Sequence, residues 1–410
     1  MVYLCLIAYV VVVYVRPGEI WTDFPFVEAL VGVSLAAAGL SYLARPRVFW
    51  DLPHDWFVLG FWIAIVASNL VGGWFGGAAW GFSEFFKVAF YYFLIRFAVR
   101  DEWQFRGLVR ALIAVNVVLA VSGIVQFHWG AGLGGITVEK TGRIRGSGIF
   151  NDPNDLALSL VMVVPFLLAP IFDATRRSGR RLLAMSCLAA VMLALYYTNS
   201  RSGILGFAII LCLYVFLRFG RAAAAVVMVA TLIVLLTWGP SRLRTYDAPT
   251  EASTRQRVQA WHAALVMFAS HPLVGVGFDR FGDFHGRAAH NSFAHVLAEL
   301  GLFGAFFWVG IYYWLFKGAL PRPPTEDDFV DRWRLPLLLS LVGVLVSSWF
   351  LSRQYVLYPY SLVGLGACYA SMLRARGIDV DLEVSARAIL QILLIVLAGI
   401  AAMYLATWIF

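Results

Sequence analysis

The sequence predicts an all-α fold: a polytopic transmembrane helical bundle of about 12–13 spans, with a helical or irregular loop region outside the membrane. Three observations predict it. Of 410 residues, 61% are hydrophobic and only 14% are charged, whereas a soluble domain averages roughly 25% charged residues. Apolar runs of spanning length recur along the whole chain. Strand alternation with a period of roughly ten residues, which would indicate an outer-membrane barrel, does not occur in the sequence.

The apolar runs are about 16–25 residues long, the length that a helix needs to cross the hydrocarbon core. Backbone groups in lipid must be satisfied within their own segment, so each run is predicted to be a helix. The first run lacks a basic segment before it and a small-residue cleavage site after it, so we interpret it as a retained span, with a signal anchor as the alternative. The whole chain, 1–410, is expected to form a single transmembrane domain. The predicted spans are 1–15, 25–44, 56–74, 80–98, 106–128, 155–174, 182–198, 203–217, 222–239, 291–316, 335–351, 355–373 and 387–410.

Basic residues in alternate joints predict the orientation, because short loops rich in Lys and Arg stay in the cytoplasm. This pattern places the N-terminus in the cytoplasm and the two long joints, 129–154 and 240–289, on the opposite face. An odd number of spans puts the C-terminus outside, unless one short span is re-entrant or two are merged. The cytoplasmic set comprises Arg45, Arg47, Arg96, Arg100, Arg106, Arg176, Arg177, Arg180, Arg181, Arg218, Arg221, Lys317, Arg322, Arg332, Arg334, Arg374 and Arg376.

Several outward joints break this pattern because they contain cations. Long loops cross the membrane regardless of charge, so solvated arginines are one explanation for the cations of the long joints. That explanation fits Arg201 poorly, because this residue lies in a very short joint between two helices, near the interface, where ionisable groups tend to be functional. Arginine offers fixed paired donors that suit phosphate and it keeps its charge, so the set predicts a diphosphate clamp. The outward cations are Lys140, Arg143, Arg145, Arg201, Arg242, Arg244, Arg255, Arg257, Arg280 and Arg287.

The segment 143–154 adds a second anion-binding feature. Gly146 and Gly148 allow close approach of a ligand to the backbone. Asn151, Asp152 or Asn154 can cap the helix that follows, with a proline in its first turn. An outward helix N-terminus favours anions, although ordinary capping of the helix would need the same residues.

His290 ends the second long joint and is a candidate general base, because a histidine near its ordinary pKa can accept the proton of a hydroxyl. A structural hydrogen-bonding role is the alternative. His295 lies five residues later and does not form a metal pair with it, and the outward joints carry no close carboxylate pair. Glu299 lies deeper in the same helix, where it could orient a neighbour or pair with a charge. No metal and no other cofactor is therefore expected.

Four segments in order resemble the superfamily of O-antigen ligases and Wzy-type O-antigen polymerases, bacterial inner-membrane transferases of lipid-linked glycans. The chain contains RGSGIFNDPNDLA at 145–157, which resembles the family's arginine-glycine and "NPN" segment, and SRSGIL at 200–205, which resembles its "SRSG" turn. RVQAW at 257–261 followed by HPLVGVGF at 271–278 resembles the arginine and "PLxGxG" segment. His290-Asn291, nine residues, Gly301 and then Gly304 resembles the ligase pattern H-[NSQ]-x9-G-x-x-[GTY].

The resemblance implies an inverting, metal-independent glycosyltransferase at the periplasmic membrane face. Its donor would be a glycan linked to undecaprenyl diphosphate, and its acceptor the hydroxyl of a lipid A core or of a growing glycan. Arg145, Arg201 and Arg257 would hold the diphosphate, and His290 would activate the acceptor or orient the donor. The predicted catalytic residues are His290, Arg201 and Arg257, and the predicted substrate-binding residues are Arg143, Arg145, Asn151, Asn154, Arg255, Arg280 and Asn291.

The ligase pattern around His290 favours a ligase over a polymerase. Some polymerases carry two R-x10-G repeats, and none of the outward arginines has glycine at that spacing. Protein O-glycosylation with the same donor is a third possibility. A transporter or flippase of an anionic lipid or solute is the alternative from another class, but its binding groups should lie near the bilayer midplane in symmetry-related halves, and the sequence shows no repeat. The expected surroundings are lipid bilayer, with no nucleic acid partner.

Overall fold

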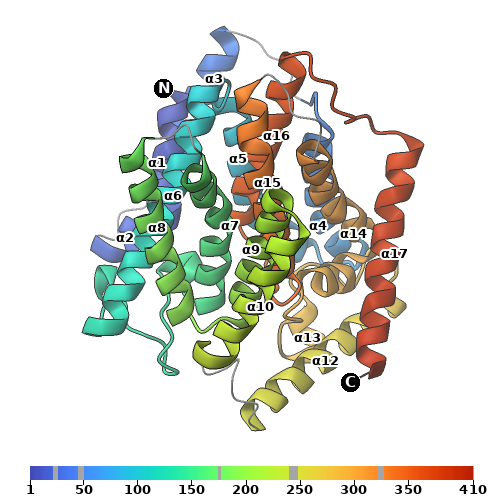
Figure 1. Cartoon of the computed structure of the whole chain (residues 1–410). Helices are drawn as coiled ribbons and strands as arrows, with labels where there is room; N and C mark the ends of the chain where they lie inside the picture. The colour runs from blue at the N-terminus through green and yellow to red at the C-terminus, as the bar shows by residue number, and fades with distance from the viewer. Residues whose placement is uncertain (22–25, 45–49, 174–176, 240–247, 321–326, 410) are drawn as a thin grey trace. The chain divides into compact units, whose positions relative to one another are not determined.

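The computed structural model describes residues 1–21, 26–44, 50–173, 177–239, 248–320 and 327–409, which form α-helices joined mostly by short segments (Figure 1). The only pairing of β type among these residues is an isolated bridge between Ala131 and Thr137. The chain divides into two compact units. The first unit comprises Met1–Arg47, Leu94–Thr245 and Ala319–Ser347, and the second comprises Val48–Phe93, Tyr246–Gly318 and Ser348–Phe410.

Every predicted span coincides with a helix, which confirms the all-α prediction. Seven of these helices in the described residues are long and apolar enough to cross a membrane: α4, α6, α7, α8, α9, α14 and α17. The chain is thus a multi-pass membrane protein, and the crossing of the other helices stays a prediction. The helices are α1 (Val2–Val15), α3 (Phe26–Ala44), α4 (Pro53–Val71), α5 (Phe75–Ala98), α6 (Glu102–Trp129), α7 (Pro153–Phe172), α8 (Ser178–Tyr197), α9 (Arg201–Phe219), α10 (Arg221–Trp238), α14 (Ser292–Ala319), α15 (Asp328–Ser348), α16 (Tyr358–Ala375) and α17 (Ala386–Ile409).

The first unit is organised around α7, which packs against α6, α8 and α9. Nearly all of the first four turns of α7 are buried, as the near-continuous apolar sequence of this helix requires. Polar side chains join it to its neighbours. Ser159 Oγ donates to Asn116 Oδ1 at 2.7 Å, and Ser340 Oγ of α15 donates to the Met162 carbonyl oxygen at 2.8 Å. Such bonds hold membrane helices together where apolar burial offers little preference between protein and lipid.

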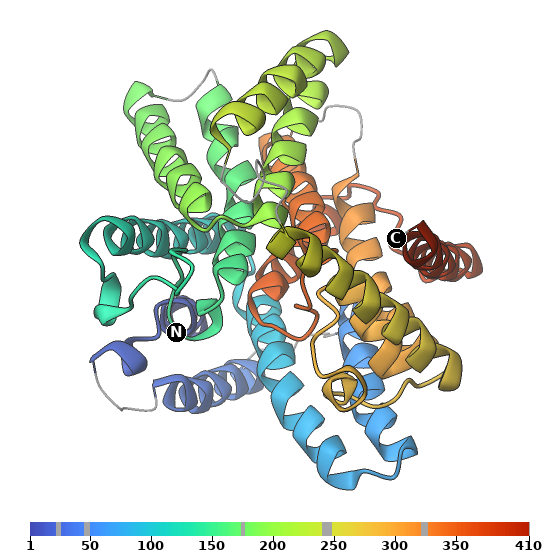
Figure 2. The ribbon, with the colours of Figure 1, turned by 90° about the horizontal axis from the view of Figure 1, so that it is seen from below.

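The second unit holds α4, most of α5, α14, α16 and α17. Its helices approach closely where glycine meets a ring, as between Gly310 and Phe57 and between Gly399 and Phe293. The long joint predicted at 240–289 contains two further helices, α12 (Ala248–Ser270) and α13 (Phe281–His285), and α12 packs against α17 (Figure 2). Arg242 and Arg244 lie outside the described residues.

The other long joint, 129–154, is irregular and contains only two single 3-10 turns, Leu133–Gly135 and Gly148–Phe150. A short helix, α2 (Pro17–Trp21), contacts the first of them. Both long joints thus have the helical or irregular character that the sequence predicts.

The feature that shapes the second unit is a break in α14 at Gly301, whose φ of 61° and ψ of −158° are not helical. The break leaves backbone groups unpaired within the helix, and the segment 272–277 satisfies them. Leu302 N donates to the Pro272 carbonyl oxygen at 2.8 Å, and Gly277 N donates to the Glu299 carbonyl oxygen at 3.0 Å. Irregular backbone inside a membrane protein needs partners of this kind. The "PLxGxG" segment therefore packs directly on the glycine of the His-Asn pattern.

Candidate substrate site

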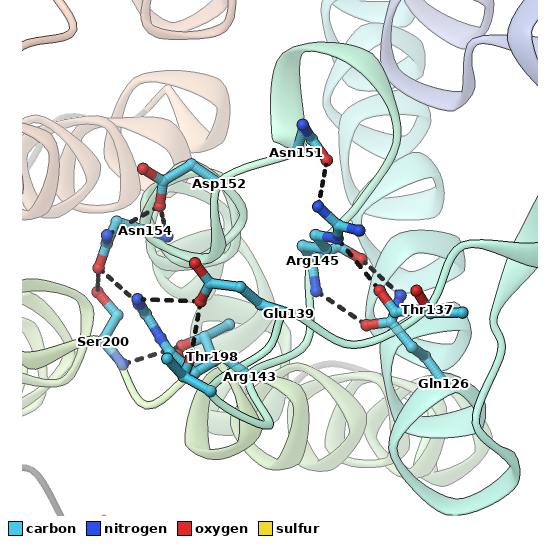
Figure 3. A network of polar contacts seen from close by, with 11 residues as sticks. Gln126, Thr137, Glu139, Arg143, Arg145, Asn151, Asp152, Asn154, Thr198 and Ser200 are labelled. Carbon is cyan, nitrogen blue, oxygen red and sulfur yellow. Dashed lines mark hydrogen bonds and ion pairs between the residues drawn. The ribbon is translucent and has the colours of Figure 1, made fainter.

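In the first unit the starts of α7 and α9 are joined by hydrogen bonds (Figure 3). The Asp152 side chain caps α7 by accepting from Asn154 N at 2.8 Å, with Pro153 as the first helical residue. Ser200 caps α9 and also donates from its hydroxyl to Asn154 Oδ1 at 2.9 Å. Two helix N-termini, each the positive end of a helix dipole, are therefore held side by side.

Arg143 fixes the loop to these helix starts. Its guanidinium donates from Nε to the Thr198 carbonyl oxygen at 2.7 Å and from Nη2 to Asn154 Oδ1 at 2.9 Å (Figure 3). Nη1 lies 3.7 Å from Glu139 Oε2. The side chain is only 8% exposed, so its donors are directed at the protein. This geometry suits a residue that positions the loop.

Arg145 is half-buried and lies at the edge of an open cavity. It donates from Nε to the Thr137 carbonyl oxygen at 3.1 Å and from Nη1 to Asn151 Oδ1 at 3.0 Å, while its backbone N–H donates to Gln126 Oε1. The cavity measures about 450 Å³ and has a mainly polar surface. Its lining comprises Ile20, Gly134, Gly135, Ile136, Thr137, Arg145, Gly146, Ser147, Gly148 and Asn151. A cation among glycine-rich backbone is a suitable environment for an anionic or sugar ligand.

Arg201 is the first residue of α9 and is half-buried. The turn before it is tight: Asn199 has a φ of 49°, and Ser200 accepts from Gly203 N in the capping position. Arg201 therefore adds a permanent charge to a helix end that already carries partial positive charge.

In the second unit the short joint that precedes α14 holds His290 in a defined position. The Trp261 indole N–H donates to the Ala289 carbonyl oxygen at 3.0 Å, and Asn291 Oδ1 caps α14 by accepting from Ala294 N at 3.0 Å. His290 lies between these two buried residues, is itself exposed, and has a φ of 50°. A left-handed backbone costs a histidine about 1–3 kcal/mol, a cost that the anchored neighbours sustain.

Three predicted arginines of the second unit have different surroundings. Arg257 lies on α12 four residues before Trp261, so both project from one face of the helix, and Trp261 contacts the residue next to His290. Arg255 is exposed on the same helix. Arg280 is engaged within the protein, since Nε lies 3.3 Å from Asp283 Oδ2 and Nη1 donates to the Val276 carbonyl oxygen at 3.4 Å.

A buried carboxylate, Glu299, ties the first two turns of α14 to the adjoining loops. Oε1 accepts from Phe281 N at 3.0 Å and lies 3.1 Å from His295 Nε2, and Oε2 accepts from the Tyr355 hydroxyl at 2.9 Å. Glu299 thus orients several neighbours at once.

Arg353 was not identified from the sequence. It lies in the joint between α15 and α16, and its backbone N–H donates to Ser292 Oγ at 2.9 Å, beside the start of α14. The signal that identified Arg201, a lone cation in a short joint predicted to face outward, applies equally to Arg353 and could have found it.

Residues 183–309 match the protein family described as O-Antigen ligase. This part of the chain is similar to the O-antigen ligase family. The resemblance inferred from the motifs is therefore confirmed, and the match supports an enzyme of the ligase/polymerase kind. No curated protein matches the chain.

The segment that matches the O-antigen ligase family extends from within α8 into α14 and includes Arg201, Arg257, His290 and Asn291. The loop with Arg143, Arg145, Asn151 and Asn154 precedes it, and Arg353 follows it. In the first unit the structure joins Arg143 to Asn154 and Arg145 to Asn151. In the second it places His290 and Asn291 at the tip of α14, next to the helix that carries Arg257.

Proposed function

We propose that this protein is an inverting, metal-independent glycosyltransferase. It moves a glycan en bloc from undecaprenyl diphosphate to an acceptor hydroxyl at the periplasmic face of the bacterial inner membrane. The observation that carries the proposal is the setting of Arg201 and His290. Arg201 begins α9, where the helix dipole and the guanidinium together favour an anion, and His290 lies immediately before α14; both are within the segment that matches the O-antigen ligase family.

In the proposed reaction the acceptor oxygen attacks the anomeric carbon from the face opposite the diphosphate. The bond between that carbon and the diphosphate oxygen breaks, and the undecaprenyl diphosphate leaves with the electron pair. The hydroxyl proton passes to His290, which its anchored neighbours hold exposed. Charge develops on the leaving diphosphate, so cations fixed in advance stabilise the transition state more than the ground state.

We assign the diphosphate to Arg145, Arg201 and Arg257. The cavity beside Arg145 and Asn151 supports the assignment in the first unit, because its polar surface and volume suit a phosphate or a sugar. Arg143 is assigned a positioning role, since its donors hold Asn154 and the Thr198 carbonyl. Arg255, Arg280 and Asn291 complete the proposed binding residues, and Arg280 would have to leave its present partners to reach a ligand.

We propose lipid A core as the acceptor, with the N-terminus cytoplasmic. The alternative is a Wzy-type polymerase that extends O-antigen or another polysaccharide. Protein O-glycosylation or transport of an anionic lipid would be the remaining outcomes of the test. The ligase is preferred because the chain contains the His290-Asn291 pattern of ligases. The glycine of that pattern, Gly301, is the residue at which α14 breaks.

Reconstitution with a lipid-linked glycan and two acceptors tests the proposal. Addition to core-type lipid A identifies a ligase, ladder growth on a second lipid-linked glycan identifies a polymerase, and the absence of any transfer refutes the proposal. Arg201→Ala and Arg257→Ala should each abolish transfer in protein that purifies normally. Transfer should persist in chelator, and an activity that a divalent ion restores would overturn the metal-independent mechanism.

A further inference from the structure

The tip of α14 receives a hydrogen bond from each of two flanking segments. On one side the Trp261 indole of α12 holds the Ala289 carbonyl oxygen at 3.0 Å. On the other, Ser292 Oγ donates to the Leu351 carbonyl oxygen at 2.6 Å and accepts from Arg353 N at 2.9 Å. His290 and Asn291 lie between these attachments. Segments that carry Arg257 and Arg353 are therefore both fastened within two residues of His290.

The joint with Arg353 is held rigidly in this place. Leu351 is buried at 2% exposure, and Tyr355 donates to the buried carboxylate of Glu299 at 2.9 Å. Arg353 itself is half-buried and donates from Nη1 to the Ser352 carbonyl oxygen at 2.8 Å. Because the backbone and the side chain of Arg353 already make hydrogen bonds, less ordering remains to be done when a ligand binds.

Asn291 provides an independent sign of a ligand at the same point. Its side chain is fully buried, and its Oδ1 caps α14, yet its Nδ2 donor has no partner. A buried donor that lacks an acceptor costs about 1–3 kcal/mol, so such groups call for an explanation. An anionic oxygen at the α14 N-terminus would satisfy both this donor and the helix dipole.

We propose that Arg353 and the Asn291 amide bind a phosphate group of the donor lipid diphosphate, on the second unit, beside His290. This inference rests on the proposed function and adds a cation that neither the motifs nor the family match identifies. The guanidinium offers paired donors to two phosphate oxygens, whereas lysine would offer only a point charge. The cation neutralises charge that grows on the departing diphosphate.

Equilibrium binding of undecaprenyl diphosphate to the full-length protein in nanodiscs tests this directly, alongside glycan transfer. Arg353→Ala should weaken binding about tenfold to a hundredfold, the range expected for hydrogen bonds to a charged group. Arg353→Lys should recover only part of the affinity. Arg387→Ala is the matched control: it removes an exposed arginine of the same unit, in the first turn of α17, and it should bind as the wild type does.

Asn291→Asp keeps the test decisive if Arg353→Ala fails to fold. Aspartate caps a helix as well as asparagine does, so α14 should start normally, while a carboxylate replaces the proposed amide donor and repels phosphate. We expect normal purification with binding at least tenfold weaker. Wild-type affinity in Asn291→Asp and Arg353→Lys would overturn the proposal.

Two further outcomes separate the possible failures. Wild-type protein that neither binds the lipid diphosphate nor transfers glycan would refute the proposed function itself. Binding that falls in Arg201→Ala but stays unchanged in Arg353→Ala would refute only this inference. A competition arm with phosphatidylglycerol addresses the source of the phosphate, because equal loss of affinity for both lipids in Arg353→Ala would mean a general membrane contact and would also overturn the proposal.

Discussion

The break in α14 makes a strong prediction for Gly301→Ala. Gly301 has a φ of 61° and a ψ of −158°, a region that is essentially restricted to glycine and costs other residues about 1–3 kcal/mol. A Cβ placed there would lie 2.5 Å from the Leu273 carbonyl carbon and oxygen, so the segment 272–277 would have to move. That movement would lose the bonds from Leu302 N to Pro272 and from Phe303 N to Leu273, worth about 0.5–1.5 kcal/mol each. The total destabilisation is about 2–6 kcal/mol.

The assay is thermal unfolding of purified protein in one detergent, compared with glycan transfer. Gly301→Ala should lower the unfolding midpoint and reduce transfer, because the same segment holds the first two turns of α14. Gly318→Ala is the matched control in the same helix: its Cβ would meet only the Ala370 Cβ at 3.8 Å, and alanine is favoured over glycine in a helix by about 1 kcal/mol. Gly318→Ala should therefore be as stable as the wild type or more so. A Gly301→Ala variant with an unchanged midpoint would refute the argument.

Three further substitutions test individual contacts by the same unfolding and transfer measurements. Asp152→Ala removes the cap of α7 and should lower the free energy of unfolding by about 1 kcal/mol. Asp152→Ser should keep most of that stability, because serine also caps helices. Equal stability of the two variants would contradict the capping role. Trp261→Phe keeps an aromatic ring in place but deletes the hydrogen bond to the Ala289 carbonyl oxygen. This change should lower the free energy of unfolding by about 0.5–1.5 kcal/mol and also reduce glycan transfer. Full activity would mean that this bond does not position His290. Tyr355→Phe should lower the free energy of unfolding by about 1.5–3 kcal/mol, because the buried Glu299 carboxylate loses a donor. The same substitution should have a smaller effect in a Glu299→Gln background. Strictly additive effects of the two substitutions would show that the two side chains do not interact.

The arrangement of helices in sequence was predictable because a lipid environment allows so few alternatives. An apolar run of spanning length must satisfy its own backbone, so the predicted spans coincide with helices along the described chain. The start of α7 was predictable to within a few residues, since Asn151, Asp152 and Asn154 were all candidate caps beside Pro153, and the structure shows that Asp152 is the cap.

The roles of individual arginines were less predictable. Arg143 and Arg145 are two residues apart and look alike in the sequence, yet Arg143 is buried among protein acceptors while Arg145 lines a cavity. That difference arises from the carbonyl of Thr198 and the side chain of Asn154, which are brought to Arg143 only by the packing of α8 and α9 on α7. No local pattern contains this information.

The sequence by itself determined the membrane class, the helix content and the resemblance to a family, because hydrophobic run length and short ordered motifs are local properties of a chain. Only the tertiary structure decided what the motif residues contact. Gly301 is the residue at which α14 breaks, and the segment 272–277 pairs with the backbone around this break. Glu299 accepts hydrogen bonds from two loops that are distant in sequence. The backbone of Arg353 lies near Asn291 because Ser292 Oγ bonds to both Leu351 and Arg353 of that joint, across 59 and 61 residues of sequence. Buried backbone groups must form hydrogen bonds, and which groups pair over a long range is determined only when the helices pack.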